Sequence, residues 1–168
     1  MLGVEQSNDD LQAAIAGDKV FIRVTGRGSF KISATLKQFI ARVSAATVVI
    51  DLAECVGMDS TFMGVLAGLA GRLKQSGRQL ELINLSEKNT QLLATLGVDQ
   101  VVTHYSNSHG YAMPEQAVRP LPTAEVTKKE LAETALQAHQ HLAELNEENR
   151  PRFKRVIEYL QADVDRLN

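Results

Sequence analysis

The stretch of residues 48–71 constrains the fold more than any other part of this chain. It reads VVIDLAECVGMDSTFMGVLAGLAG. Its first five residues are a nearly continuous apolar run, which is typical of a central strand covered on both faces. A short loop follows, and the Asp, Ser and Thr at 59–61 are residue types that commonly begin helices. The stretch therefore predicts a buried strand over 48–52, a loop, and a helix over about 60–75.

The elements on either side of this stretch indicate the fold class. Residues 11–16 and 20–24 predict two short strands, and Gly17-Asp18 between them is a turn signal that favours a β-hairpin. The remaining pattern predicts a helix, a strand, a helix and a short strand over residues 33–43, 80–84, 86–97 and 101–102. Strands and helices in this order predict an α/β fold, with helices packed on a mixed sheet.

The composition changes after residue 106. Residues 107–123 contain Pro114, Pro120 and Pro122 and predict an irregular linker. Beyond it, Thr127 and Glu130 have the spacing of a capping box, and apolar residues recur at helical steps over two segments. We therefore expect an α/β domain over 1–106, the linker, and a helical hairpin over 124–168.

The apolar stripes of these two helices need a surface, because isolated helices of this length are marginal in water. That surface could be the other helix, the α/β domain, a partner protein or a second copy of the chain. The sequence leaves these alternatives open, a homodimer through the C-terminal helices included.

Composition excludes several classes of protein. The chain has 168 residues and a net charge of -2, so nothing draws it generally to nucleic acid or to an anionic membrane. Its longest apolar stretch, residues 62–71, is about half the length needed to cross a bilayer, and we expect no membrane insertion. The single cysteine, Cys55, suits a reducing cytoplasm, and we expect it to be a small apolar residue near a strand end.

One family resemblance rests on the residues quoted above. A strand ending in Val-Ile-Asp-Leu, then Met-Asp-Ser-Thr, then Gly64 in the first turn of a helix, resembles the STAS domain. This domain forms bacterial anti-sigma factor antagonists and the cytoplasmic tails of sulfate transporters. The resemblance covers about the first two thirds of the chain and implies a STAS-like fold. It also implies phosphorylation of a Ser or Thr after Asp59 by a kinase that is itself an anti-sigma factor. Ser60 is the first candidate and Thr61 the second.

Two functions follow from this resemblance. In the first, the chain is a non-enzymatic switch in signal transduction and transcription regulation. Its partner, an anti-sigma factor or switch-type protein kinase, binds through Asp59, Ser60, Thr61, Phe62 and Met63, with Arg27 favouring a nearby phosphate. A phosphate on Ser60 would weaken this contact by adding negative charge beside Asp59.

In the second, Ser60 only caps its helix, and the chain is an unphosphorylated STAS adaptor or assembly subunit. Its helical tail would then provide oligomerisation or docking. Two departures from the family pattern favour this function: Phe62 replaces a glycine beside the phosphoacceptor, and Ser29 stands where signalling members carry an Asp.

The sequence predicts no catalytic, cofactor or metal site. Asp51 and Asp59 could form an acid pair, but no further titratable residue is placed beside them. His139 and His141 are two apart on a predicted helix and do not share a face, so we expect solvated histidines rather than metal ligands. The chain has no nucleotide-binding glycine motif. We expect neither enzymatic activity nor a cofactor.

Overall fold

A seven-stranded mixed sheet forms the centre of the molecule in our computed structural model, which describes residues 9–121 and 126–168. The strands are β1 (Asp10–Ala16), β2 (Lys19–Gly28), β3 (Thr47–Asp51), β4 (Cys55–Met58), β5 (Gln79–Ile83), β6 (Thr103–His104) and β7 (Arg119–Pro120). The helices are α1 (Phe30–Arg42), α2 (Ser60–Gln75), α3 (Glu87–Leu96), α4 (Lys128–Leu145) and α5 (Asn149–Leu167), with 3-10 turns η1 (Val98–Gln100) and η2 (Glu115–Ala117).

The sheet has the order β6-β5-β3-β2-β1-β7, and β4 pairs with β2 outside this order. β1 pairs antiparallel with both β2 and β7, whereas β2, β3, β5 and β6 run parallel. β2 is long enough to serve two neighbours: its first half lies beside β3 and its last residues lie beside β4. The predicted α/β fold with a mixed sheet is confirmed.

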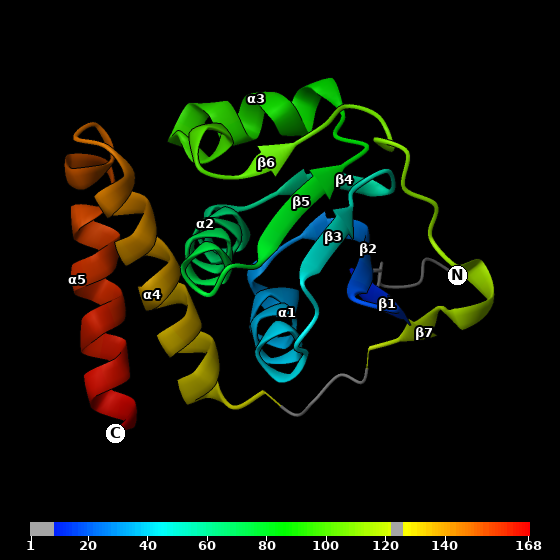
Figure 1. Ribbon diagram of the computed structural model, residues 1–168. Coiled ribbons are helices and arrows are strands. Elements are labelled where there is room, and N and C mark those ends of the chain that lie inside the picture. The colour runs from blue at the N-terminus through cyan, green and yellow to red at the C-terminus, as the bar shows by residue number, and fades with distance from the viewer. Residues whose placement is uncertain (1–8, 122–125) are drawn as a thin grey trace, which may run out of the picture.

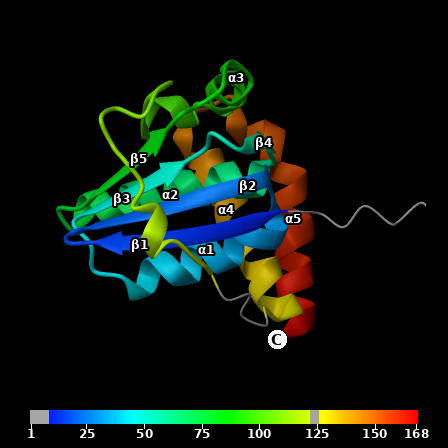
Figure 2. The same cartoon turned by 90° about the vertical axis from the view of Figure 1, so that its right-hand side faces the viewer.

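The elements form layers (Figure 1). α1 and α2 cover one face of the sheet, and the antiparallel pair of α4 and α5 lies outside them (Figures 1 and 2). This pair is the predicted helical hairpin. Ala138, Leu142 and Phe153 of the hairpin belong to the main hydrophobic core, so it packs both on itself and on the α/β domain. Buried Asn149 fixes the turn by donating to the carbonyl oxygens of Leu96 and Leu142, each at 2.8 Å.

The second face of the sheet is covered by the segment predicted to be an irregular linker. Tyr111 and Met113 of this segment, together with Tyr105 just before it, pack there on Phe21, Val49 and Ile83. The segment also contributes η2 and the short strand β7. Residues 1–8 and 122–125 lie outside the described residues. They contain the start of the predicted α/β domain and the predicted boundary between the linker and the hairpin.

Several predicted boundaries are confirmed and others are wrong. α2 spans 60–75, Ser86 caps α3, Gly97 ends α3 with a φ of 79°, and Thr127 and Glu130 form the capping box. α1 begins at Phe30 rather than residue 33, because Ser29 is its cap. Residues 55–58, predicted as a loop, form β4. The last parallel strand is displaced from 101–102 to Thr103–His104, because η1 occupies the preceding residues.

Cys55 is buried as expected, with 5% of its surface exposed. Among the described residues, no helix has both the length and the apolar character needed to cross a membrane.

Candidate functional site

Asp59 is the cap that begins α2. One carboxylate oxygen accepts a hydrogen bond from the Phe62 N–H at 2.9 Å, and the other accepts one from the Phe30 N–H at 2.8 Å. Asp59 therefore satisfies free backbone donors at the starts of α2 and α1 together. Ser60 is the first residue inside the helix, so the alternative in which Ser60 only caps the helix is wrong.

Ser60 is engaged by the C-terminal hairpin. Its Oγ lies 2.9 Å from Nε2 of His139 on α4, and Nδ1 of that histidine lies 2.7 Å from the carbonyl oxygen of Ala135. A carbonyl can only accept, so Nδ1 carries a proton; in the neutral ring, Nε2 then accepts the hydrogen bond from the Ser60 hydroxyl. The His139 ring is 5% exposed and packs edge-on against Phe153. The expectation that His139 is solvated is therefore wrong.

The residues after Ser60 point into the protein. Thr61, Phe62 and Met63 are 7%, 0% and 5% exposed. The Phe62 ring lies against Gly28, where an added Cβ would stand 2.7 Å from a ring carbon. In this conformation Asp59 and Ser60 are half-buried, and the three residues that follow them are closed to a partner.

Asp9 places a carboxylate beside Ser29. It accepts a hydrogen bond from the Ser29 hydroxyl at 2.9 Å and another from the backbone N–H of Arg27 at 3.0 Å. Arg27 itself is exposed and lies opposite Gly57 of β4. An acidic group thus stands near the position where the STAS resemblance implies an Asp, although it comes from another part of the chain.

Two glycines on α2 allow α4 to approach closely. A Cβ at Gly64 would stand 2.3 Å from the carbonyl oxygen of Ala138, and one at Gly68 would stand 2.7 Å from the His141 ring. Both clashes are with α4. Sequence reasoning missed Ala138, His139 and His141 as neighbours of α2. The apolar stripe on α4 signalled a buried face without indicating which surface it covers.

Ser60 and His139 have the separation of a nucleophile and its base. Three observations instead favour a role in attaching α4 to α2. Nδ1 of His139 lies at a backbone carbonyl rather than a carboxylate, and His139 is buried. Both carboxylate oxygens of Asp59 already accept backbone hydrogen bonds at the starts of α1 and α2. Asp51 accepts from Ala53 N–H and Asn84 at 3.0 Å each, which holds the loop after β3. Within residues 9–121 and 126–168, no group of three or more His, Cys, Asp or Glu is arranged to hold a metal ion.

Comparison with known proteins identifies the class. A family model described as "Mlab, STAS domain" matches residues 11–103. This match spans more than half of the chain and contains β2, β3 and the start of α2. The chain belongs to this STAS family.

Solved structures share the fold at low sequence identity. An NMR structure of the protein TM1081 aligns with a TM-score of 0.53 and 16% identity, covering 65% of this chain and 87% of that one. A crystal structure of TM1081 from Thermotoga maritima, described as a candidate anti-sigma factor antagonist, aligns with a TM-score of 0.51 and 18% identity, covering 55% and 83%. SLC26A9 aligns with a TM-score of 0.50 and 15% identity, covering 62% of this chain and 23% of that one. At these identities the likeness establishes the fold.

Proposed function

We propose that this chain is a non-enzymatic, cytoplasmic STAS adaptor in which the C-terminal hairpin controls access to the start of α2. The hydrogen bond between Ser60 and His139 carries this proposal. The burial of Thr61, Phe62 and Met63 supports it. A protein that binds at residues 59–63 must first displace α4, or else it must bind the outer surface of the hairpin.

This adaptor function needs no phosphate. The hairpin is attached by the Ser60–His139 hydrogen bond, two close helix contacts at Gly64 and Gly68, and a shared hydrophobic core. Each of these contacts exists with an unmodified Ser60. The adaptor would therefore be assembled whether or not a kinase is present.

A phosphorylation switch is the second candidate, and the half-exposed position of Ser60 at a helix start favours it. A phosphate there would add about -1.5 to -2 charge beside Asp59 and remove the hydrogen that Ser60 donates to His139. It would thus act on the hairpin first and on an anti-sigma factor or kinase partner second. Thr61 is the weaker acceptor, because it is 7% exposed.

The test combines modification mapping with partner binding. The full chain would be purified from its native host under growth and stress, and residues 55–72 would be mapped by mass spectrometry with and without phosphatase. Co-purifying proteins would be quantified for wild type, Ser60→Ala and Ser60→Asp. The adaptor function predicts an unmodified peptide and one stoichiometric partner that is retained by Ser60→Ala. A phosphatase-sensitive phosphate on Ser60, with a partner lost only from Ser60→Asp, would replace the adaptor with the switch.

A further inference from the structure

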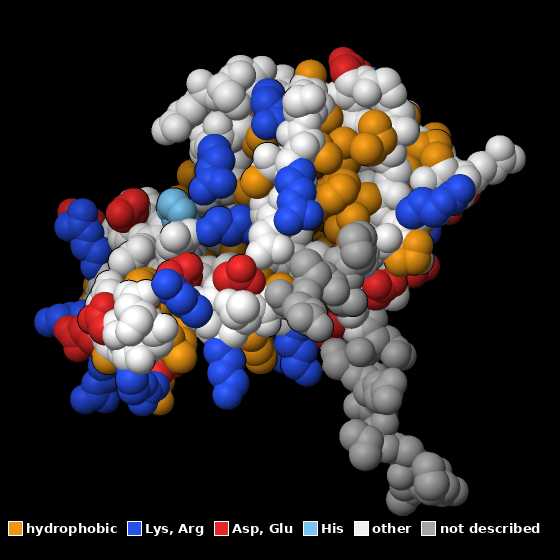
Figure 3. Space-filling view, turned by 90° about the horizontal axis from the view of Figure 1, so that it is seen from below, with side chains coloured by type: hydrophobic (Ala, Val, Ile, Leu, Met, Phe, Trp, Pro, Cys, Tyr) orange, Lys and Arg blue, Asp and Glu red, His pale blue; other side chains and the backbone are white. Residues whose placement is uncertain are grey.

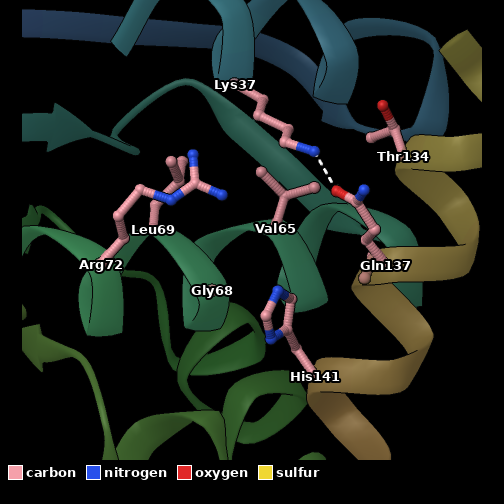
Figure 4. Close-up of a pocket in the computed structure, with 9 residues that line it drawn as sticks. Lys37, Val65, Gly68, Leu69, Arg72, Thr134, Gln137 and His141 are labelled. Carbon is pink, nitrogen blue, oxygen red and sulfur yellow. Dashed lines mark hydrogen bonds between the residues drawn. The ribbon is translucent and has the colours of Figure 1, made fainter. Parts of the chain in front are cut away.

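A small pocket lies between α1, α2 and α4, about two to three helical turns along α2 from Ser60. Figure 4 shows Lys37 of α1, Arg72 of α2 and His141 of α4 pointing into it around Val65. The pocket encloses about 260 Å³, its open mouth included. Part of this space is open solvent, so the pocket is a surface hollow rather than an enclosed cavity.

Every charged side chain that lines this pocket is basic. The Lys37 ammonium donates to the amide oxygen of Gln137, which is neutral. Across the described ranges 9–121 and 126–168, neither Lys37 nor Arg72 has a salt bridge. Figure 3, seen from below, shows Lys and Arg side chains in the middle of that face, with Asp and Glu side chains beside them.

The charge of Arg72 lowers the affinity of Lys37 and of His141 for protons. The pKa of Lys37 is lowered by burial and then by the charge of Arg72, while Glu133 opposes this. His141 remains partly exposed. Its pKa is lowered first by burial, is raised in part by the charge of Glu144, and is lowered further by the charges of Lys37 and Arg72. Like charges held close together where three helices meet repel one another. A bound anion would offset this repulsion and raise the pKa of these groups.

Gly68 holds the histidine in this arrangement. A Cβ at this position would stand 2.7 Å from Cδ2 and 2.9 Å from Nε2 of His141. The missing side chain lets the imidazole lie against the α2 backbone, beside Arg72 one turn further along the helix. The pocket is thus shaped by backbone as well as by charge.

We propose that this pocket binds a small oxyanion of the phosphate class, held by Arg72 and Lys37, with His141 as a third donor when protonated. A guanidinium presents two parallel N–H donors that match two phosphate oxygens. The adjoining groove contains Glu130 and Glu133, which would repel a larger polyanion. The bound anion would touch α1, α2 and α4 together and hold the hairpin on the domain. This inference goes beyond the adaptor function and does not depend on it.

The test is an NMR titration of the full chain that follows the histidine ring signals, with His141 assigned from the His141→Gln variant. Inorganic phosphate would be added up to about 20 mM, enough to saturate a site of millimolar affinity, against chloride at matched ionic strength. We expect a saturable shift of the His141 signal and a rise of its pKa, because an anion stabilises the protonated ring. Methyl phosphate in a parallel titration shows whether a phosphate ester binds as well as the free ion.

Two variants make the result decisive. Arg72→Gln should weaken phosphate binding about tenfold or more, since it removes a charge-assisted bond. Lys74→Gln, an exposed cation on the same helix, should leave binding within about twofold of wild type. Equal melting temperatures in chloride would show that both variants are folded, and Lys37→Gln would replace Arg72→Gln if that variant unfolds. Absence of a saturable shift, an equal effect of chloride, or an equal loss in Lys74→Gln would overturn the proposal.

Discussion

The Ser60–His139 hydrogen bond joins side chains 79 residues apart in the sequence. Ser60→Ala would leave Nε2 of His139 without its donor in a largely buried position. We expect a loss of about 1 kcal/mol or more in the free energy of unfolding, which is the usual effect of orphaning a buried acceptor. Urea denaturation would measure it. Ser108→Ala, at an exposed loop residue, is the control and should be neutral; a similar loss in both variants would contradict a specific role for the bond.

Tyr111 gives a pH-dependent prediction. Its hydroxyl donates to Glu81, and this bond with a carboxylate raises the pKa of Tyr111 to about 12. The unfolded value is about 10, so the stabilisation is fully present below pH about 10 and is lost as the pH rises to about 12. Absorbance titration should show one of the three tyrosines ionising late, and Tyr111→Phe should abolish that step.

The same variant tests the stability effect. The difference in unfolding free energy between wild type and Tyr111→Phe should be largest near neutral pH and should shrink by pH 11, since tyrosinate forms first in the unfolded chain. A difference that stays constant over this range would contradict the assigned bond.

Single residues of the site were only partly predictable. Asp59 and Ser60 were found because cap residues and a buried strand leave a local signal in the sequence. His139 was not, because its contact with Ser60 depends on how two distant helices dock. The Asp9 carboxylate beside Ser29 was missed for the same reason, since a pairing of residues 20 apart leaves no local pattern.

At the level of elements, the contact of α2 with α4 is set by two glycines. Gly64→Ala would place a Cβ 2.3 Å from a backbone oxygen of α4, which cannot move away without shifting that helix. We expect a loss of about 1–3 kcal/mol in the free energy of unfolding and faster amide hydrogen exchange in α4.

Gly71→Ala is the matched control, because a Cβ there meets nothing within 4 Å. Gly71→Ala should raise the free energy of unfolding by about 0.5–1 kcal/mol, since Ala is the better helix former. The two variants should therefore have effects of opposite sign. If Gly64→Ala were as stable as Gly71→Ala, α4 would not be docked as described.

Elements with strong periodicity were predictable, and short ones were not. α2, α3 and the capping box of α4 follow from apolar spacing and cap residues. β4 is four residues long and contains Gly57, so its pairing with β2 leaves no strand pattern. Glycines inside a helix indicate that another element approaches closely, but they do not show that the element near Gly64 and Gly68 is α4.

For the molecule as a whole, the shared core predicts joint unfolding of hairpin and domain. Ala138, Leu142 and Phe153 are buried in the same cluster as the sheet residues Ile22 and Ile50. Because these side chains lose their packing together, we expect one cooperative transition. Hydrogen exchange under mild denaturant should remove amide protection from α4 and β3 at the same free energy. An α4–α5 unit that exchanges first would show that the hairpin is an independent body.

The absent side chain at Gly64 also provides a way to sort related sequences without their structures. A helix can lie against α2 at this distance only where that position has no Cβ, because the nearest atom is backbone and no choice of rotamer relieves the contact. A STAS chain with a C-terminal hairpin and a larger residue at this position would have to hold its hairpin farther from α2. Among STAS chains that carry such a hairpin, this one position would thus separate close docking on α2 from more distant docking.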